Sequence, residues 1–252
     1  MTTDANNPPF IEHLIEIRQR LIRSVLAILI CFAGLAVFAN DIYTQIASPL
    51  LEVMPEGAGM IATDVAAPFF APFKLAFMLA IVVAFPYLLH QMWGFIAPGL
   101  YSHEKKLAAP ILFSSVFLFY SGIAFAYFVV FPLAFAFFTS VAPEGITIAT
   151  DISSYLDFVL KIFIAFGFAF EVPIVVFVAC WAGATSVESL SEKRPYVVVS
   201  AFILGMFLTP PDVISQTLLA VPMWLLFELG LLMSRLVDKK KDGQQTNNEL
   251  KE

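Results

Sequence analysis

The sequence predicts an all-α integral membrane protein with six transmembrane helices and both termini in the cytoplasm. Its 252 residues are 60% hydrophobic and only 13% charged, with a mean hydropathy of +0.85. By comparison, about a quarter of the residues in an ordinary globular domain are charged. The apolar residues form six blocks, and the cations are concentrated in every second connection between those blocks. A soluble protein has no physical reason to sort its cations in this way.

Six apolar blocks account for the six predicted crossings. They span roughly residues 24–39, 75–93, 108–131, 158–181, 196–209 and 213–234. Because a helix rises about 1.5 Å per residue, about 20 residues are needed to cross about 30 Å of hydrocarbon. The second, third and fourth blocks reach this length. The first block reaches it only with its flanking residues, and the last two are short.

The cations set the orientation, since 12 of the 14 Lys and Arg residues lie in alternate connections. These cations are Arg18, Arg20, Arg23, Lys105, Lys106, Lys193, Arg194, Arg235, Lys239, Lys240, Lys241 and Lys251. The intervening connections are acidic, with only Lys74 and Lys161 at their edges. Short connections rich in Lys and Arg stay on the cytoplasmic side of a membrane. Six crossings therefore return the chain to the cytoplasm.

An amphipathic helix is predicted over residues 10–23, before the first crossing. Its apolar residues recur at helical spacing, at Phe10, Leu14, Ile17 and Leu21. Glu16 and Arg20 are four residues apart and lie on one face of this helix. A solvated ion pair between them is the plainest interpretation, and it stabilises a helix by a few tenths of a kcal/mol.

Prolines inside or beside the blocks predict bent helices. Pro86, Pro173 and Pro222 are internal, while Pro110 and Pro132 lie near the ends of the third block. Each proline removes a backbone donor and bends its helix. We therefore expect an open, concave arrangement with two short C-terminal helices. Such short helices either thin the local bilayer or pack steeply against longer neighbours.

Two segments that lie 87 positions apart resemble each other. Residues 61–65 (IATDV) recur as residues 148–152 (IATDI), and the same shift pairs Lys74 with Lys161. In both copies the Thr-Asp pair would cap the start of the next helix. The resemblance predicts a parallel repeat that covers the second and fourth blocks. Chance together with common capping chemistry explains it equally well.

The chain carries no motif for nucleotide hydrolysis, metal binding or nucleophilic catalysis. Cys31 and Cys180 lie inside apolar blocks, and the three histidines are scattered along the sequence. We therefore expect no cofactor, no metal and no enzymatic activity. A nucleotide-driven pump and an intramembrane metalloprotease are both disfavoured.

Glu171 is the most informative single residue, because it lies well inside the fourth apolar block. A carboxylate there costs about 3 kcal/mol on insertion scales and is functional by default. It would anchor a partner helix or act as a proton-sensitive switch, whereas an internal hydrogen bond beside Pro173 is the alternative. Thr209 and Gln216 are polar residues near the ends of the short blocks, where polar groups favour helix association. Capping of the turn at Asp212 is the alternative for these.

Two carboxylates flank apolar surface on the predicted cytoplasmic side. Glu16 lies on the first helix, and Glu104 follows the second block in the segment 95–106. Together they could receive guanidinium groups in charge-assisted hydrogen bonds. On composition alone, however, ordinary interfacial loops are the better interpretation.

At these residues the chain resembles the TatC family, the core subunits of twin-arginine protein translocases. The matching stretches are residues 13–18 (HLIEIR), 48–50 (SPL), 95–101 (FIAPGLY), 103–104 (HE), 125–132 (FAYFVVFP), 170–173 (FEVP), 193–196 (KRPY) and 208–213 (LTPPDV). The resemblance covers roughly residues 10–236. Its motifs are ordered along the whole chain, and none of the matching positions departs from the family pattern.

The resemblance implies a receptor rather than a catalyst, one that binds twin-arginine signal peptides of folded cargo proteins. Glu16, Phe95 and Glu104 would form the signal-peptide site. The residues expected to face partner helices are Glu171, Met206, Thr209 and Gln216. The residues expected to support the outer loops and the translocation step are Pro49, Phe69, Tyr127 and Asp212.

The resemblance also implies partners and a location. TatB-like and TatA-like single-span subunits would join the chain in the cytoplasmic (inner) membrane of a bacterium, where the proton-motive force drives export. Self-association in a receptor complex is expected, and nucleic acid is not. Residues 1–236 would form the membrane domain, and residues 237–252 a disordered cytoplasmic tail. The alternatives are a proton-coupled small-molecule secondary transporter that uses Glu171, and a passive scaffold.

Overall fold

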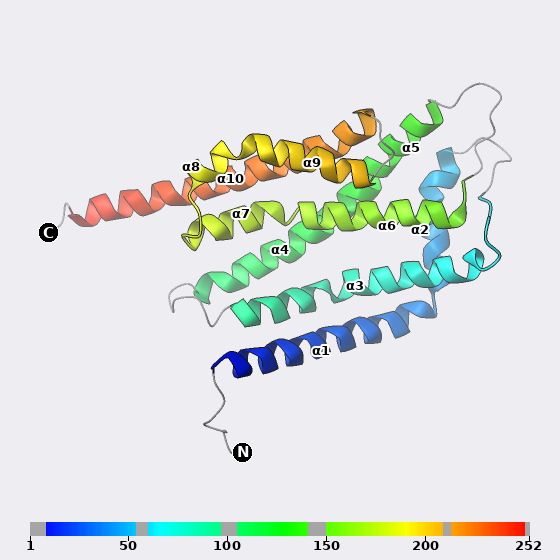
Figure 1. Ribbon diagram of the computed structural model, residues 1–252, viewed down its shortest axis with the longest axis horizontal. Coiled ribbons are helices and arrows are strands. Elements are labelled where there is room, and N and C mark those ends of the chain that lie inside the picture. Colours follow the sequence, from blue (N-terminus) through cyan, green and yellow to red (C-terminus); the bar gives the residue numbers. More distant parts are fainter. Residues whose placement is uncertain (1–8, 54–59, 97–104, 141–149, 209–212, 250–252) are drawn as a thin grey trace, which may run out of the picture. The chain divides into compact units, whose positions relative to one another are not determined.

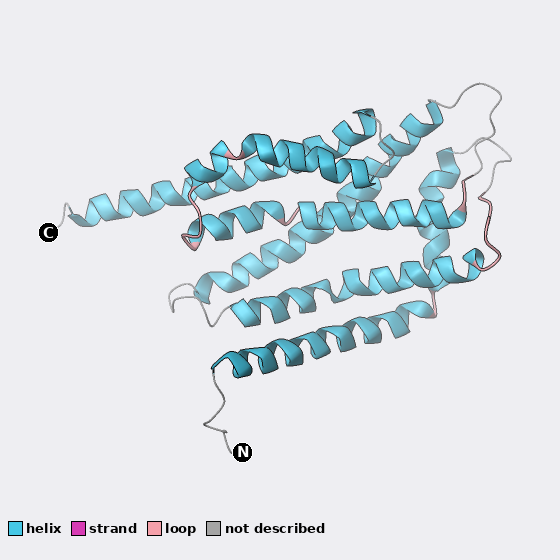
Figure 2. Cartoon of the chain, in the orientation of Figure 1, coloured by secondary structure: helices cyan, strands magenta, loops and turns pink. Residues whose placement is uncertain are grey.

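The computed structural model describes residues 9–53, 60–96, 105–140, 150–208 and 213–249, which are almost entirely helical (Figure 2). The elements are α1 (Pro9–Ala36), α2 (Ala39–Val53), α3 (Ala67–Ile96), α4 (Lys105–Phe125), the π-helix η2 (Ala126–Val130), α5 (Phe131–Ser140), α6 (Ile152–Ala169), α7 (Val172–Trp181), α8 (Val187–Glu192), α9 (Arg194–Leu208) and α10 (Val213–Glu249). Figure 1 shows their order along the chain. The described residues also contain one isolated parallel bridge, between Ile61 and Asp151.

Among the described residues, five stretches are long and apolar enough to cross a membrane. They are Leu14–Ala36, Ala67–Phe95, Ala109–Phe137, Ile152–Trp181 and Gln216–Leu236. These stretches match five of the six apolar blocks, so the prediction of an all-helical, multi-pass protein is confirmed. The fifth block forms α9, whose 15 residues give about 22 Å of helix. A sixth crossing through α9 and the cytoplasmic placement of the termini stay predictions.

The helices group into two compact units, and the single membrane domain predicted for residues 1–236 stays a prediction. One unit contains Met1–Val116 with Ala149–Leu156, and the other contains Phe117–Ile148 with Asp157–Glu252. The boundary falls inside α4 and again near the start of α6. Each unit therefore draws on segments that are far apart in the sequence.

In the first unit, α1 and α2 pack against α3 (Figure 1). The rings of Phe32 and Phe77 meet edge to face, with centroids 5.6 Å apart. The predicted amphipathic helix 10–23 and the first apolar block merge into one helix, because no strong helix breaker separates them. Helix α2 was not predicted; it buries Ala39 and Ala47 while its other face stays polar.

In the second unit, aromatic side chains fill the contact between the α4–η2–α5 segment and α6. Phe131 lies 5.3 Å from Phe163 between ring centroids, and Phe125 lies 5.5 Å from Phe166. The backbones come closest at Gly122, where an added Cβ would lie 2.4 Å from the carbonyl oxygen of Phe166. Small residues permit such close approach, which drives helix association within lipid.

Prolines disturb the described helices at two places. Helix α6 ends at Ala169 and α7 begins at Val172, with Pro173 in the first turn of α7. Pro132 follows η2, whose wider turn places the Phe131 amide on the carbonyl of Ala126. A proline cannot donate its own hydrogen bond and its ring crowds the preceding turn, which explains both interruptions. The predicted concave arrangement stays a prediction.

Helix α10 is longer than its apolar block. It continues from Val213 to Glu249. The separate cytoplasmic tail predicted for residues 237–252 stays a prediction. The segment from Lys239 to Lys241 contains good helix formers, which explains why the helical geometry can extend past the apolar residues.

Candidate functional site

The carboxylate of Glu16 is held by Arg20, one helical turn further along α1. The Nε and Nη2 atoms of Arg20 donate to Glu16 Oε1 over 3.0 and 2.6 Å. The two side chains are only partly exposed, at 37% for Glu16 and 24% for Arg20. The ion pair expected from the sequence spacing is therefore present. Arg20 therefore occupies one of the two carboxylate oxygens of Glu16, which is also a residue of the predicted signal-peptide site.

Arg20 also reaches the C-terminal end of α3. Its Nη1 atom donates to the carbonyl oxygen of Gln91 over 3.2 Å, and Nη2 donates to that of Gly94 over 2.8 Å. Gly94 is one of the last four residues of α3, whose carbonyls lack intrahelical partners and carry partial negative charge, so a guanidinium is well placed there. This tertiary contact was not predicted. Only the tertiary structure brings residues that lie more than 70 positions apart into contact.

The remaining members of the predicted signal-peptide site are described in part. Phe95 lies in the last turn of α3, next to Gly94, and is half-buried. Glu104 lies outside the described residues. The structure thus brings Glu16 to the end of α3 that carries Phe95, while the pairing of Glu16 with Glu104 stays a prediction.

Glu171 lies at the interruption between α6 and α7. Its amide donates to the carbonyl of Phe168, and its own carbonyl accepts from the amide of Val175, over 3.0 and 2.9 Å. It occupies the N-cap position of α7, and its Oε1 atom is buried. The positive end of the α7 dipole favours a carboxylate at this position. The break therefore gives Glu171 a structural role in addition to any role toward a partner.

Two further predicted partner-facing residues lie on α9 and α10. Met206 is 50% exposed on α9, and its role toward a partner helix stays a prediction. Gln216, near the start of α10, packs against α9, where its Cα lies 3.5 Å from the position of a Cβ on Gly205. Thr209 lies outside the described residues.

An apolar groove of about 780 Å³ lies among α6, α7, α9 and α10. Its walls include Phe168 and Val172, the close sequence neighbours of Glu171, together with Leu204 of α9. Lys161 and Lys193 also line it. An apolar lining of this kind suits lipid chains or a helix side rather than a polar solute.

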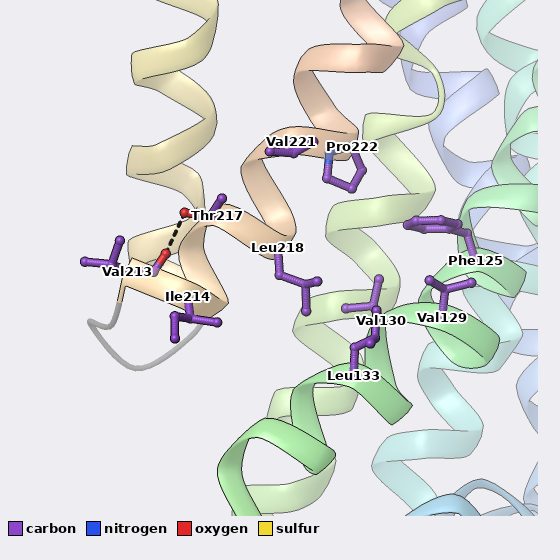
Figure 3. A pocket seen from close by; sticks show the side chains of 10 residues that line it. All are labelled: Phe125, Val129, Val130, Leu133, Val213, Ile214, Thr217, Leu218, Val221 and Pro222. Atoms are coloured by element: carbon purple, nitrogen blue, oxygen red, sulfur yellow. Dashed lines mark hydrogen bonds between the residues drawn. The ribbon is translucent and has the colours of Figure 1, made fainter. Parts of the chain in front are cut away.

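A second groove, of about 590 Å³, lies between the η2–α5 segment and the start of α10 (Figure 3). Val129 and Leu133 line one side, and Ile214 and Leu218 line the other. The hydroxyl of Thr217 donates to the carbonyl of Val213 over 2.6 Å, within α10 itself. The polar group of Thr217 is therefore engaged in its own helix.

The residues predicted to support the outer loops and translocation are scattered over several elements. Phe69 is exposed at the start of α3 and stacks with Phe70 and Phe73, with centroids 5.1 Å away in each case. Tyr127 lies in η2, with its ring centroid 5.0 Å from that of Phe128. Pro49 lies in α2, but its side chain is outside the description, as is all of Asp212.

A clamp around Asp151 joins the two segments that resemble each other in sequence. The amide and hydroxyl of Thr63 donate to Asp151 Oδ1 over 3.0 and 2.9 Å, and those of Ser154 donate to Oδ2. These hydrogen bonds, first that from the Thr63 amide, lower the pKa of Asp151 to about 2. The predicted cap exists at Asp151, whose Oδ2 accepts from the Ser154 amide in the first turn of α6. Asp64 Oδ1 accepts from the Ala66 amide, which precedes α3, so this hydrogen bond belongs to the turn before the helix. The parallel repeat itself stays a prediction.

Sequence reasoning missed a bidentate ion pair between α9 and α10. Arg194 Nε lies 2.5 Å from Glu228 Oε1, and its Nη2 lies 3.0 Å from Oε2. The parallel fork geometry makes this pair stronger than a point-charge contact. No sequence signal connects two residues that lie 34 positions apart.

The described part of the chain offers three polar features that a ligand or partner could contact. Within it, no three His, Cys, Asp or Glu side chains are grouped to hold a metal ion. The polar features are a carboxylate held beside a helix end, a carboxylate at a helix break, and a bidentate ion pair. Around them lie extended apolar surfaces.

Comparisons with known proteins identify close relatives. The family model described as "Sec-independent protein translocase protein (TatC)" matches residues 12–222. A protein of that name from Haemophilus influenzae is 58% identical over 98% of this chain and 97% of its own length. One from Escherichia coli is 56% identical over 90% of this chain and 88% of its own length.

Two solved structures that resemble this chain are also of TatC proteins. A crystal structure described as "Twin Arginine Translocase Receptor- TatC" superposes with a TM-score of 0.80 and 39% sequence identity. The match covers 89% of this chain and 98% of that one. A second crystal structure of such a receptor, in the detergent DDM, gives a TM-score of 0.81 at 38% identity.

Proposed function

Because this chain belongs to the TatC family of Sec-independent protein translocase proteins, we propose that it is the receptor subunit of a twin-arginine translocase and binds twin-arginine signal peptides. The observation that carries this conclusion is the match of one family model to residues 12–222, over most of the chain. The protein is a multi-pass membrane protein with a transport function rather than an enzyme. Its substrates are proteins bearing the signal peptide.

The signal-peptide site is formed by Glu16, Phe95 and Glu104. A planar guanidinium makes better-directed hydrogen bonds to a carboxylate than an ammonium does, which favours two arginines over two lysines. Support comes from the fixed position of Glu16 beside the end of α3 that carries Phe95. Because Glu16 is partly exposed, its attraction to a peptide is weakened by salt.

The topology is six crossings, with α9 as the fifth and both termini in the cytoplasm of a bacterium. The support is the distribution of Lys and Arg, which places Arg20 and Arg194 on one side of the membrane. A crossing by α9 requires the bilayer to be locally thin, since α9 has 15 residues. A thinned bilayer would lower the barrier to cargo passage.

Single-span TatB-like and TatA-like subunits bind at the surface that carries Glu171, Met206, Thr209 and Gln216, and receptor units self-associate. Exposed Met206 and the apolar groove next to Glu171 support a helix-binding surface. Transport is driven by the proton-motive force.

Pro49, Phe69, Tyr127 and Asp212 support the translocation step through the outer loops. The exposed ring of Phe69 and the position of Tyr127 in the π-helix are the supporting observations, since π-helical turns are frequent at functional sites.

A small-molecule transporter that uses Glu171 was the alternative function. Such transporters combine broken helices with converging polar groups near the middle of the membrane. The α6–α7 interruption supplies the broken helix, but the groove beside it is lined mainly by apolar side chains. Membership of the TatC family therefore favours the receptor.

The test is binding of a labelled twin-arginine signal peptide to the purified protein in detergent. We compare wild type with Glu16→Gln and Glu104→Ala, and an Arg-Arg peptide with its Lys-Lys counterpart. We expect tight binding only for wild type with the Arg-Arg peptide. Equal binding of both peptides by all three proteins would move the recognition site elsewhere.

A further inference from the structure

We propose that Arg20 is a positioning residue for signal-peptide recognition, which it serves by fixing the carboxylate of Glu16 to the C-terminal end of α3. This inference rests on the proposed signal-peptide site and adds a member to it. In this arrangement Arg20 occupies Oε1 of Glu16, and Oε2 is the atom that receives the guanidinium of the peptide.

The geometry around Arg20 differs from that of an ordinary surface ion pair. Three nitrogens of one guanidinium make four hydrogen bonds, two to Glu16 Oε1 and one each to the carbonyls of Gln91 and Gly94. A pair within one helix leaves both side chains mobile and contributes little. Here the guanidinium is tied to a second helix, so α3 as well as α1 determines where the carboxylate lies.

Arg20 uses only one of the two carboxylate oxygens of Glu16, which leaves the other oxygen for a peptide ligand. Both hydrogen bonds from Arg20 end on Oε1. Within the described ranges, no donor is recorded within hydrogen-bonding distance of Oε2. A carboxylate accepts several hydrogen bonds, so a second guanidinium can be added without displacing the first. A preorganised carboxylate also loses less freedom when the peptide binds.

Arg20 should also increase the selectivity of the site for arginines over lysines in the signal peptide. Because its positive charge already offsets that of Glu16, a second cation gains little from simple attraction. The peptide must instead form well-directed hydrogen bonds to an oxygen in a fixed position, which the planar guanidinium does better than an ammonium. Loosening Arg20 should therefore reduce selectivity more than it reduces overall attraction.

Gly94 provides a way to displace Arg20 without altering α1. A Cβ at Gly94 would lie 2.4 Å from Arg20 Nη1, and its three nearest atoms all belong to the Arg20 side chain. The guanidinium can swing away while the two helices stay in place. Gly94→Ala should thus break the hydrogen bonds from Arg20 to α3. Arg20→Lys should keep the positive charge but lose the planar group that donates to both Glu16 and α3.

The experiment measures dissociation constants of the Arg-Arg and Lys-Lys signal peptides for the full chain in detergent, by fluorescence anisotropy. The test variants are Arg20→Lys and Gly94→Ala. The matched controls are Arg23→Lys, an exposed arginine of the same helix, and Gly34→Ala, where an added Cβ meets no atom within 4 Å. Thermal unfolding of every variant verifies that it is folded.

We expect both test variants to lower the Lys-Lys to Arg-Arg ratio of dissociation constants by about tenfold, the effect of roughly one charge-assisted hydrogen bond. The controls should keep the wild-type ratio. In the Glu16→Gln background, Gly94→Ala should have no further effect on the ratio, because it acts through Glu16. A purely structural role of Arg20 would instead lower thermal stability and leave the ratio unchanged.

The results distinguish a failure of the inference about Arg20 from a failure of the proposed signal-peptide site. If Glu16→Gln abolishes selectivity while Arg20→Lys and Gly94→Ala keep the wild-type ratio, the role of Arg20 is refuted and the receptor site stands. If Glu16→Gln binds both peptides like wild type, the proposed site and the inference fall together.

Discussion

Gly122→Ala and Gly34→Ala are the same substitution, yet we expect them to change stability in opposite directions. Replacing a helical glycine by alanine stabilises a helix by about 0.5–1 kcal/mol, because it reduces the freedom of the unfolded chain. At Gly34, on α1, an added Cβ meets no atom within 4 Å, so only this gain applies. At Gly122, on α4, the Cβ would lie 2.4 Å from the carbonyl oxygen of Phe166 and 2.9 Å from its carbon.

The contact at Gly122 determines the magnitude. Ordinary contact begins at 3.4 Å, so α4 and α6 must separate by about 1 Å. The obstacle is backbone rather than a flexible side chain, and a gap of this size forfeits a quarter to a half of each dispersion contact. Overpacking of this kind costs about 2–3 kcal/mol. After the gain in helix propensity, about 1–2 kcal/mol of destabilisation remains.

Thermal unfolding of both variants in the same detergent measures this difference. For a chain of this size, 1 kcal/mol shifts the Tm by about 2–4 °C. We expect the Tm of Gly122→Ala to fall by about 2–8 °C, and that of Gly34→Ala to rise by about 1–4 °C. A Gly122→Ala protein as stable as wild type would refute the close approach of α4 and α6.

Three further predictions concern polar groups near the helix ends. Because the pKa of Asp151 falls from 3.8 to about 2 on folding, the contribution of this carboxylate to the stability of the fold is fully present above pH 3.8 and is lost as the pH falls through 2. Asp151→Asn removes the charge from the acceptor of the Thr63 amide and should therefore speed hydrogen exchange at Thr63 at neutral pH. Burial, with Asp151 nearby, raises the pKa of Tyr43 to about 12. The difference between the ultraviolet titrations of wild type and Tyr43→Phe, which removes the signal of the six other tyrosines, should therefore show the Tyr43 phenolate only near that pH. Arg194→Lys loses the bidentate pair with Glu228 and should loosen α9 against α10, which slower disulfide formation between two cysteines introduced for this purpose, one on each helix, would detect. Unchanged exchange at Thr63 in Asp151→Asn would contradict the Thr63–Asp151 contact, and a Tyr43 phenolate near pH 10 would contradict the burial of that side chain. Unchanged cross-linking in Arg194→Lys would contradict the contact between Arg194 and Glu228.

The candidate site shows where local sequence reasoning stops. The spacing of Glu16 and Arg20 predicted their ion pair, because residues four apart meet on one face of a helix. Nothing in that spacing predicts that Arg20 also binds the carbonyls of Gln91 and Gly94. These contacts depend on how α1 lies along α3, which is a property of packing rather than of helical period.

The Asp151 clamp gives a second example. The sequence predicted that Asp64 and Asp151 cap their helices, since a cap requires only residues within one turn. It did not predict that Thr63 binds the carboxylate of Asp151 across 88 positions. The two similar segments were interpreted as equivalent parts of a repeat, and the structure shows that they also contact each other.

The sequence by itself determined the class, which is an all-helical, multi-pass membrane protein, and the residues that resemble the TatC family. These features follow from composition, from the fixed rise of a helix and from motifs that are continuous in the chain. Only the tertiary structure decided how Arg20 holds Glu16, how Arg194 joins α9 to α10, and where α6 breaks before Pro173. A hydrogen bond between distant residues depends on distance in space, which sequence spacing does not report.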